Sequence, residues 1–408
     1  MRIEKKTPSI MGRANKANVL HLIKDQGPIS RASVAKTLNM SRSTISSIVD
    51  QLIREGRVRE GLTGESTSAG GRRPVDLHYI PDARFALGVD IGATKTIALL
   101  TDLAGNVIYR EKFWSHESGV MPMAHIHARL ERMLQNASIP RNNIIGTAIG
   151  FPGVTLANEG VVVEANPLEI KNFLARDFFL NLPAPIWVDN DVNMAVIGER
   201  WKGAAVGRDN VVLIAVGTGI GAGFILDGRI YRGANSFAGE FGHLQIDPSC
   251  VTERRSLGDY GPLERVASGK GMQDYALQQR PYYPHTILTD TATADEIFAA
   301  EQAGDPLARE VVERATSHLV FSIANMVTLL NPDVVIIGGG VARAGEPLIQ
   351  RIKSGVSRLS PMPCDIVLAS LGEDAAAYGS AATVLLKAGE IRLTGFDDWQ
   401  VVSESGDA

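Results

Sequence analysis

The sequence has very little cysteine and no long hydrophobic segment. Of its 408 residues only Cys250 and Cys364 are cysteines, which excludes a disulfide scaffold and any metal site built from several thiolates. The longest apolar runs, such as residues 334–337, are far shorter than the ~20 residues that span a bilayer. The N-terminus carries no apolar signal core, so we expect a cytoplasmic protein without a membrane partner.

Charge is neither abundant nor evenly distributed along the chain. Charged residues make up 21% and hydrophobic residues 45%, which is typical of a folded protein, and the length predicts two or three domains. Residues 1–80 hold 14 Lys and Arg against 7 Asp and Glu, a net charge of +7. The remainder holds 27 against 38, a net charge of −11. We therefore expect only the N-terminal part to contact a polyanion.

The first 80 residues have the pattern of a winged helix-turn-helix. A helical period begins near residues 17–24 and ends at Gly27-Pro28, and Ser30 and Ser41 are placed to cap two further helices. The last helix carries an apolar stripe that recurs every three or four positions, formed by Ile45, Ile48, Val49, Leu52 and Ile53. Alternation at residues 57–60 and 75–79 predicts two strands of a wing. This head predicts DNA binding, and a protein-docking module of three helices is the alternative.

The exposed start of the third helix carries the side chains expected to contact DNA. Most are small hydrogen-bonding groups, and two arginines in the wing loop are expected to reach the minor groove. The set is Ser41, Arg42, Ser43, Thr44, Ser46, Ser47, Arg72 and Arg73. Because such heads act in pairs, we expect a homodimer or a dimer of dimers on palindromic operator DNA.

Beyond residue 84 the chain twice repeats a strand, a turn rich in glycine and threonine, and a second strand. The turns lie at residues 91–96 and 217–223, more than 120 residues apart. Backbone N–H groups in such turns can hold phosphate, and Asp90 can hold a metal-bound water. One such turn can simply be a tight turn, but the pair predicts a duplicated α/β fold with a nucleotide or sugar cleft between two lobes.

Polar residues elsewhere in this body are candidates for ligand binding. Residues 189–193, Asp-Asn-Asp-Val-Asn, mark a strand-to-helix junction, where Asp191 is a candidate general base and Asn190 a candidate partner of a sugar hydroxyl. A simple helix cap is the alternative. Glu240 and His243 are spaced to face one ligand or to form a surface pair, and residues 338–340 predict a turn whose backbone can approach an adenine.

Six motifs, in this order along the chain, resemble the ROK family of sugar-responsive repressors, uncharacterised reading frames and sugar kinases. They are Asp90–Lys95, Ile149–Gly153, Asp189–Asn193, Gly217–Gly223, Ala238–His243 and Asn331–Gly340. The resemblance implies an α/β fold of two actin-like (ribonuclease-H-like) lobes. The winged helix-turn-helix in front of it is similar to that of the repressor members, those of N-acetylglucosamine and xylose genes among them.

Matched position by position, the resemblance implies two sets of site residues. Sugar hydroxyls would be contacted from Gly153, Asn166, Asn190, Asp191, Glu240, His243 and Glu264. In kinase members the residue at Asp191 deprotonates the accepting hydroxyl. Phosphates would be held by Asp90, Gly92, Thr94, Gly217, Thr218 and Gly219, with Gly339 against the adenine.

The chain departs from the family pattern in two places. Members with structural zinc have three clustered cysteines after the histidine at His243, but here only Cys250 follows, and tetrahedral zinc needs four ligands. We therefore predict no bound metal and no cofactor. Ala93 stands where kinase members usually have glycine, and its methyl group can crowd a phosphate. ATP and Mg²⁺ would be needed only if the chain were a kinase.

These observations predict a sugar-responsive repressor that is not an enzyme, in which a small sugar or sugar phosphate in the cleft weakens operator binding. Two alternatives stay open. One is an ATP-dependent sugar kinase with an added DNA-binding head, because Asp191 is retained, and the other is a regulator whose body docks a protein. We expect a DNA-binding domain at residues 1–80, a two-lobed sugar-binding domain at 84–390 and a frayed C-terminal tail at 391–408.

Overall fold

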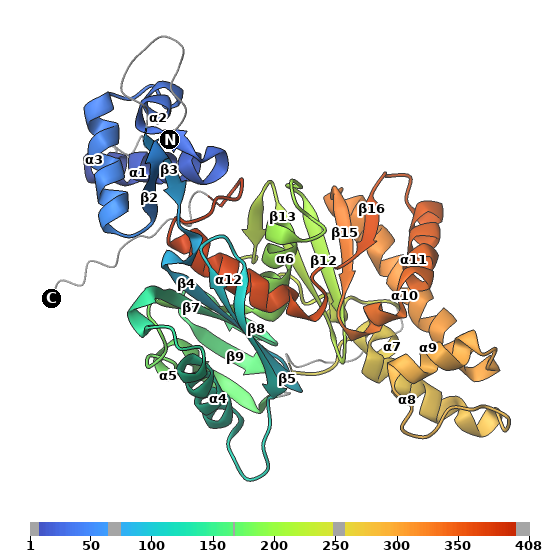
Figure 1. Cartoon of the computed structure of the whole chain (residues 1–408). Coiled ribbons are helices and arrows are strands. Elements are labelled where there is room, and N and C mark those ends of the chain that lie inside the picture. The colour runs from blue at the N-terminus through green and yellow to red at the C-terminus, as the bar shows by residue number, and fades with distance from the viewer. Residues whose placement is uncertain (1–7, 64–74, 166–167, 248–257, 397–408) are drawn as a thin grey trace.

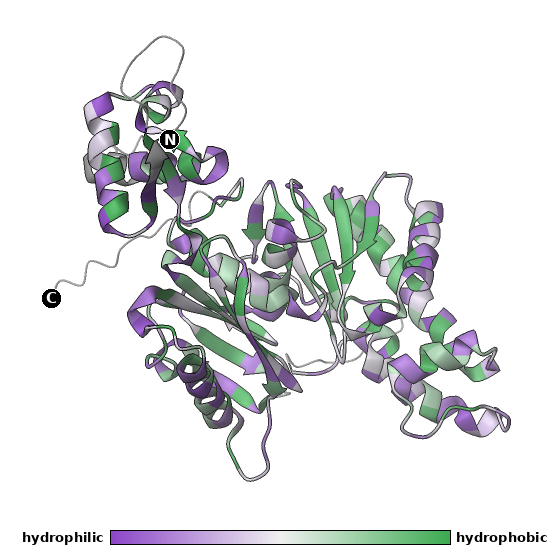
Figure 2. Cartoon of the chain, in the orientation of Figure 1, coloured by the Kyte–Doolittle hydropathy of each residue, from purple (hydrophilic) through white to green (hydrophobic). Residues whose placement is uncertain are grey.

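The chain folds into a small N-terminal head and two larger lobes, with one helix between the lobes (Figure 1). The computed structural model describes residues 8–63, 75–165, 168–247 and 258–396. Apolar residues gather in the central strands of both lobes and on the helix faces that pack against them (Figure 2). This arrangement follows from the sequence pattern, since the central strands are nearly continuous apolar runs and are buried on both faces.

The head is the predicted winged helix-turn-helix. Its elements are α1 (Pro8–Gln26), β1 (Ile29–Ser30), α2 (Arg31–Thr37), α3 (Arg42–Arg54), β2 (Val58–Thr63) and β3 (Val75–Tyr79). Ser30 and Ser41 cap α2 and α3, because each side-chain oxygen accepts a hydrogen bond from the backbone N–H three residues later, at 3.1 Å. Strands β2 and β3 form the antiparallel wing, and the apolar stripe of α3 is buried in the head core.

The first lobe is built on a five-stranded sheet with the strand order β11-β7-β4-β5-β6. Its sheet strands are β4 (Phe85–Ile91), β5 (Lys95–Asp102), β6 (Val107–Trp114), β7 (Ile144–Phe151) and β11 (Ile186–Asn190). The other elements are α4 (Pro122–Asn136), β8 (Val154–Leu156), β9 (Val161–Ala165), β10 (Ile170–Leu174), α5 (Ala175–Phe178) and α6 (Asp191–Lys202). Helix α4 and the small sheet β8–β10 enclose the apolar core of this lobe.

The second lobe also contains a five-stranded sheet, with the order β14-β13-β12-β15-β16, and each of its strands corresponds to one strand of the sheet in the first lobe. The strands are β12 (Val211–Val216), β13 (Ile220–Leu226), β14 (Arg229–Tyr231), β15 (Val334–Gly338) and β16 (Asp365–Leu368). In both sheets the first three strands form an antiparallel meander, and the last two continue from the first strand in parallel. The predicted duplication is therefore confirmed by the pairing of the strands.

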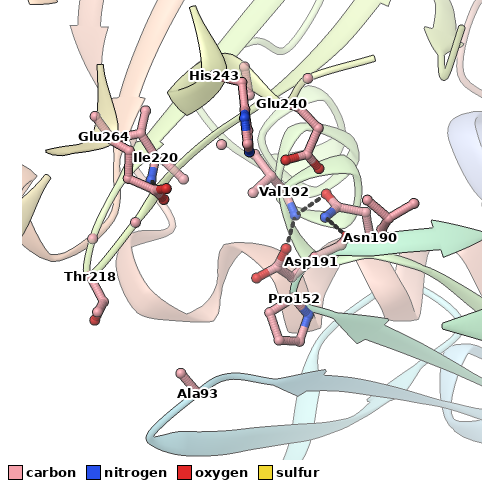
Figure 3. Close-up of a pocket in the computed structure, with 18 of the residues that line it drawn as sticks. Ala93, Pro152, Asn190, Asp191, Val192, Thr218, Ile220, Glu240, His243 and Glu264 are labelled. Carbon is pink, nitrogen blue, oxygen red and sulfur yellow. Dashed lines mark hydrogen bonds between the residues drawn. The ribbon is translucent and has the colours of Figure 1, made fainter. Parts of the chain in front are cut away.

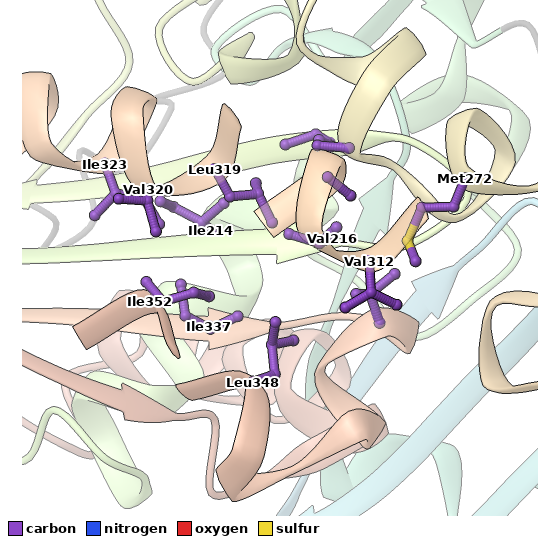
Figure 4. Close-up of a cluster of buried hydrophobic side chains, with 14 of the residues drawn as sticks. Ile214, Val216, Met272, Val312, Leu319, Val320, Ile323, Ile337, Leu348 and Ile352 are labelled. Atoms are coloured by element: carbon purple, nitrogen blue, oxygen red, sulfur yellow. The ribbon is translucent and has the colours of Figure 1, made fainter. Parts of the chain in front are cut away.

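Helices cover the outer side of the second sheet and form the largest apolar core of the protein. They are α7 (Glu264–Ala267), α8 (Gly269–Gln279), α9 (Ala294–Gln302), α10 (Pro306–Leu330) and α11 (Glu346–Leu359). Figure 4 shows this core, where side chains of β12 and β15 such as Ile214 and Ile337 meet Leu319 of α10 and Ile352 of α11.

Helix α12 (Ala375–Lys387) joins the two lobes by packing along α6 and against β4. The two helices approach so closely that a Cβ atom on Gly379 would lie 1.6 Å from the carbonyl oxygen of Met194. Only glycine fits such a contact. The apolar cluster around these helices contains buried residues of both sheets, for example Ala148 and Ile336. The lobes thus share one core at the base of the space between them.

Residues 388–396, which we call the C-terminal segment, differ from the frayed tail that we expected. Ile391, Leu393 and Phe396 are buried in the cluster between the lobes, and Gly395 lies against Gly228 of the β13–β14 turn. These three apolar side chains, spaced two or three residues apart, therefore anchor the segment to the two lobes. We call the two lobes together the trunk. Residues 397–408 lie outside the described part of the chain.

The head is docked on the trunk by polar contacts that involve this segment. Arg57 of the head and Glu390 form an ion pair in which the two side chains are 13% and 6% exposed. Arg392 donates to Asn18 Oδ1 at 2.5 Å, and Lys24 Nζ donates to the carbonyl oxygen of Leu103 in the first lobe at 3.1 Å. The head therefore contacts both the first lobe and the C-terminal segment.

Candidate functional site

A cavity of about 460 Å³ lies between the lobes, above the shared core. Its walls come from the β4–β5 turn and residues 152–154 of the first lobe, the start of α6, and the β12–β13 turn and residues 236–243 of the second. Figure 3 shows Asn190, Asp191, Glu240 and His243 gathered around one space, with Ala93 on the opposite, first-lobe wall. A cavity of this volume, with amide, imidazole and carboxyl groups among its lining residues, can hold a small hydrophilic ligand.

The floor of the cavity is the junction between β11 and α6. Asn190 is the N-cap of α6, and its Oδ1 accepts the N–H groups of Val192 at 2.9 Å and Asn193 at 3.0 Å. Its Nδ2 donates to the carbonyl oxygen of Gly153 at 2.9 Å, which ties the helix to the other wall. Asp191 Oδ1 also accepts the Val192 N–H, at 2.9 Å, and its second oxygen is left for a ligand. The helix cap and the candidate ligand group therefore coexist here.

Asp189 holds this junction in place from below. Its carboxylate is almost fully buried and accepts a hydrogen bond from Arg232 Nε at 2.9 Å, so the pair connects β11 of the first lobe to the end of β14 in the second. The other oxygen of Asp189 accepts from the N–H of Asn190 at 2.8 Å and from Asn193 Nδ2 at 3.1 Å. The carboxylate thus fixes the orientation of the residues that face the ligand.

The second lobe contributes three titratable side chains to the cavity. Glu240 and His243 border a short 3-10 helix, residues 241–243, and Glu264 begins α7. Glu264 Oε1 accepts the N–H of Ile220 at 2.9 Å, and Oε2 accepts that of Gly261 at 3.2 Å. The structure places the Glu264 carboxylate in the cavity wall against the β12–β13 turn.

Burial changes the proton affinity of the carboxyl groups in and below the cavity. Burial raises the pKa of Asp191 to about 7, the N–H of Val192 opposes that rise, and the Glu240 carboxylate adds to it. Burial also raises the pKa of Glu240, which nearby His243 lowers. The pKa of Asp90 is well above its ordinary range, first through burial and then through the carboxylates of Asp191 and Asp374. Asp191 therefore exchanges a proton near neutral pH, as a group that binds or deprotonates hydroxyls can.

The candidate phosphate-binding residues divide into two groups. Thr94, Gly217, Thr218, Gly219 and Gly339 line the same cavity as the candidate sugar residues. Asp90 and Gly92 do not line it, although they precede Ala93, which does. Two N–H groups of the turns are already bonded within the turns, Gly92 to the carbonyl oxygen of Lys95 at 3.0 Å and Gly217 to that of Gly219 at 2.8 Å. Fewer donors thus remain for a phosphate than the glycine pattern suggests.

Most of the candidate sugar residues share the cavity, and further residues that the sequence analysis did not name join them. Gly153, Asn190, Asp191, Glu240, His243 and Glu264 all line it, whereas Asn166 lies outside the described residues. Glu164, Ser236, Asp259 and Tyr260 also line the cavity. Glu164 lies on β9, where the residues Val161–Ala165 show no regular alternation of buried and exposed positions that could have singled it out. The others follow glycine-rich loops whose path no local pattern reveals.

The candidate DNA-contacting side chains on α3 are exposed at the outer end of the head. Ser41, Arg42, Ser43, Thr44 and Ser47 are exposed, and Ser46 is half-buried. Ser41 Oγ, besides capping α3, is within 2.9 Å of Ser43 Oγ and 2.8 Å of Thr44 Oγ1. Arg72 and Arg73 lie outside the described residues, so the wing loop adds nothing here. The described part of the face is polar, and apart from Arg42 its candidate side chains are serines and a threonine.

The described ranges contain neither a metal-binding cluster nor a helix that could cross a membrane. Within these ranges, no group of three or more His, Cys, Asp or Glu side chains is arranged so that it could bind a metal ion. Cys250 lies outside the described residues. Helices in the same ranges all fall short of the length and hydrophobicity that a bilayer-spanning segment requires.

Comparison with known proteins matches both parts of the chain. The sequence model of the ROK family matches residues 86–387, and that of a winged helix-turn-helix DNA-binding family matches residues 14–59. The xylose repressor of Caldicellulosiruptor bescii is 30% identical over 369 residues, which are 86% of this chain and 89% of the repressor. A glucokinase of Halalkalibacterium halodurans is 32% identical over 313 residues, 72% of this chain and 93% of the kinase.

A solved structure resembles most of the chain. The crystal structure of a ROK family transcriptional regulator, described as a homologue of the Escherichia coli MLC protein, superposes with a TM-score of 0.76 at 28% identity. The match covers 93% of this chain and 96% of that regulator. Head and trunk are therefore both shared with a transcriptional regulator.

Proposed function

The chain belongs to the ROK family, and on that premise we propose that it is a transcriptional repressor whose operator affinity falls when a sugar occupies the cavity between its lobes. The observation that carries the proposal is the presence, in one chain, of a winged helix-turn-helix and a sugar-type cavity joined through buried contacts. The match to the xylose repressor covers 86% of this chain, more than residues 84–390 alone make up, whereas the match to the glucokinase covers 72%.

The head is the DNA-binding domain, which we assign to residues 1–80. Helix α3 enters the major groove with Ser41, Arg42, Ser43, Thr44, Ser46 and Ser47 toward the bases and phosphates, and Arg72 and Arg73 reach the minor groove from the wing. Two copies of the chain place two α3 helices on the half-sites of a palindrome, about 34–36 Å apart. The +7 charge of this region makes binding steeply dependent on salt.

The trunk is the sugar-binding domain, which we assign to residues 84–390 together with the packed residues 391–396. Asn190, Asp191, Glu240, His243, Glu264 and the backbone at Gly153 hold the sugar hydroxyls, and Asn166 belongs to the same set. The carboxylates accept hydrogen bonds from sugar hydroxyls, whereas the amide and imidazole groups can both donate to and accept from them, so the set can hold a hydroxyl in either role. No structural zinc and no cofactor take part, because His243 and Cys250 supply only two ligands.

Sugar binding reaches the head through the contacts between head and trunk. Lys24 contacts the first lobe at Leu103, while Arg57 and Asn18 contact the C-terminal segment, which in turn packs on the second-lobe turn at Gly228. A ligand that draws the lobes together changes the relative position of these anchors, and with it the spacing of two heads on DNA. The ligand needs to favour one state by about 1–3 kcal/mol for a useful response.

The proposal is tested by operator binding with and without sugar. Fluorescence anisotropy on a palindrome selected from random DNA by the full-length protein is expected to give nanomolar affinity, a steep salt slope, and at least fivefold weaker binding with one sugar of a panel that begins with xylose and glucose. Unchanged operator affinity with every sugar and sugar phosphate contradicts the proposal. In that case a protein partner captured by the trunk becomes the better explanation.

A sugar kinase is the second candidate, and the observation in its favour is the retained Asp191 with a pKa of about 7. A kinase releases ADP when it receives ATP, Mg²⁺ and the correct sugar, and the replacement Asp191→Asn abolishes that release. We expect no sugar-dependent ADP release from the wild-type chain. Turnover that Asp191→Asn removes assigns the chain to the kinases with an added head.

A further inference from the structure

We infer that the buried ion pair of Asp189 and Arg232 couples the floor of the cavity to the C-terminal segment that holds the head. The use of this coupling for a sugar signal rests on the proposed function. Three observations carry the inference: the way in which Asp189 divides its two oxygens, the contacts of Arg232 in the second lobe, and the packing of the C-terminal segment on the hairpin that leads to Arg232.

The carboxylate of Asp189 divides its two oxygens between the cavity floor and the second lobe. Oδ1 accepts the N–H of Asn190 at 2.8 Å and a hydrogen bond from Asn193 Nδ2 at 3.1 Å. Oδ2 accepts hydrogen bonds from Arg232 Nε at 2.9 Å and Nη2 at 2.5 Å. The two side chains of the ion pair are 4% and 22% exposed, so water competes little for these charge-assisted bonds. One carboxylate therefore joins the floor in the first lobe to a side chain of the second.

Arg232 also contacts the wall of the cavity that belongs to its own lobe. Its carbonyl oxygen accepts the N–H of Ala238 at 3.1 Å, and Ala238 lines the cavity in the loop that carries Glu240 and His243. The side chain of Arg232 thus reaches the floor, while its backbone holds the wall of the second lobe. A ligand that draws the floor and this wall together therefore moves both anchors of one residue.

The hairpin that leads to Arg232 packs against the C-terminal segment. Strands β13 and β14 are antiparallel neighbours, and the turn between them carries Gly228. A Cβ atom on Gly228 would lie 2.7 Å from the carbonyl oxygen of Thr394, and one on Gly395 would lie 2.4 Å from the carbonyl oxygen of Gly228. Backbones packed this closely transmit a displacement of the turn to the segment.

Helix α12 provides a second route from the ion pair to the same segment. Lys387 is the last residue of α12 and directly precedes the C-terminal segment. Burial lowers the pKa of Lys387, the Arg232 charge lowers it further and the Asp189 carboxylate opposes the change, so the ammonium group lies within the electrostatic reach of the pair. Figure 1 shows that α12 ends beside the head, where the segment continues from it. A change in the ion pair therefore acts on the start of the segment as well.

The segment in turn holds the head, through the pair of Arg57 with Glu390 and the hydrogen bond from Arg392 to Asn18. A continuous series of contacts thus leads from the cavity floor through the ion pair, the hairpin and the segment to α1. Such a series transmits a signal only if a change at one end alters the other end. Replacement of Arg232 breaks the series at a single joint and therefore tests it.

The variant Arg232→Met of the full-length protein separates sugar binding from the response of the head. Asp189 Oδ1 keeps its bonds to the floor, so we expect the recognised sugar to bind within about tenfold of the wild-type affinity. Asp189 Oδ2 loses its partner, so operator affinity should change less than twofold on saturation with that sugar, against about fivefold or more in the wild type.

Hydrogen exchange of the C-terminal segment tests the same joint without any sugar. The N–H groups of Glu390 and Phe396 are hydrogen-bonded to the carbonyl oxygens of Leu385 and Leu393, so their exchange reports opening of the segment. In Arg232→Met we expect this exchange to become about fivefold faster or more. The measurement is therefore independent of the proposed function.

Two graded replacements keep the test decisive if Arg232→Met fails to fold. Arg232→Gln keeps a hydrogen-bond donor but loses the charge, and Arg232→Lys keeps the charge but loses the second donor group. We expect exchange of the segment to be fastest in Arg232→Met, slower in Arg232→Gln and slowest in Arg232→Lys, and the sugar response to return in that order. The matched control is Arg351→Gln, which removes an arginine whose partner Glu301 is 10% exposed inside the second lobe, and both measurements should match the wild type.

Equal exchange of the segment in the wild type, Arg232→Met and Arg232→Gln overturns the inference, and so does an equally large change in Arg351→Gln. A full sugar response in Arg232→Met overturns it as well. A wild-type protein whose operator affinity no sugar alters contradicts the proposed function instead, and hydrogen exchange then decides whether the ion pair couples the floor to the segment.

Discussion

Replacing Glu390 by glutamine perturbs the contact by which the head is docked on the trunk. Glu390 is the partner of Arg57, and burial raises the pKa of Glu390 while the Arg57 charge lowers it. The variant keeps the shape of the side chain but leaves the Arg57 charge without its main partner. We expect the head to dock less tightly and the sugar signal to be lost.

The size of the effect follows from the burial of the pair. Removing one partner of a fully buried ion pair costs about 3–5 kcal/mol. Arg57 is 13% exposed and has a second carboxylate, Glu55 Oε2, at 3.7 Å from its Nη1, which compensates for part of the loss. We therefore expect docking to weaken by about 2 kcal/mol, or roughly 30-fold in the docking equilibrium. A coupling of 1–3 kcal/mol between sugar and operator cannot be transmitted through a contact weakened by that amount.

The assay is the operator affinity with and without saturating sugar, measured beside the sugar affinity. In Glu390→Gln we expect sugar to change operator affinity less than twofold, while calorimetry still detects sugar binding. Glu301→Gln is the matched control, because Glu301 is 10% exposed and pairs with Arg351 inside the second lobe, away from the head. A full sugar response in Glu390→Gln, or an equal loss in Glu301→Gln, refutes the reasoning that the Arg57–Glu390 contact carries the signal.

Three further predictions concern the site, the helix between the lobes and the head. Burial raises the pKa of Asp191 to about 7, above an ordinary value near 3.9, so the contribution of this side chain to stability is fully present below about pH 4 and is lost as the pH rises through 7. The replacement Asp191→Asn should therefore raise the melting temperature at pH 8 but not at pH 4. Equal changes in the melting temperature at both pH values contradict the raised pKa of Asp191. In Gly379→Ala the new methyl group meets the Met194 carbonyl at 1.6 Å, so urea unfolding should show a loss of about 3 kcal/mol or more, against less than 1 kcal/mol for Ser357→Ala on the exposed face of α11. Arg42→Ala should weaken operator binding by about 1–3 kcal/mol and reduce the salt slope by about one, whereas a wild-type slope would remove Arg42 from the DNA interface.

The sequence predicted those parts of the fold that depend on local pattern. The head could be inferred because the caps at Ser30 and Ser41 and the apolar stripe of α3 each depend on residues only three or four positions apart. The duplicated sheets could be inferred because both glycine-rich turns follow apolar strands. The packing of α12 on α6 could not, because it depends on Gly198 and Gly379 meeting across 181 positions of the chain. Long-range contacts of small residues leave no local period.

The candidate site shows the same division. Asn190 and Asp191 stand at the end of β11 and could be inferred, since strand ends of α/β sheets converge on a common edge. Glu240 and His243 lie in a loop beyond β14, and only their spacing and the family resemblance pointed to them. Asp90 and Gly92 belong to a turn of the expected kind but do not line the cavity, because Ala93 and Thr94 are the residues of that turn that face it. We expected a frayed tail because the chain ends in polar residues, and this expectation overlooked the apolar residues Ile391, Leu393 and Phe396, which are buried.

The most direct test of the account is the distance between two heads on one operator duplex. Spin labels at Gln51→Cys, on an exposed position of α3 outside the candidate DNA-contacting set and in a background without Cys250 and Cys364, report that distance by pulsed electron resonance. The account predicts a narrow distribution on DNA that shifts by several ångströms or broadens when the recognised sugar saturates the cavity. An identical distribution with and without bound sugar contradicts it.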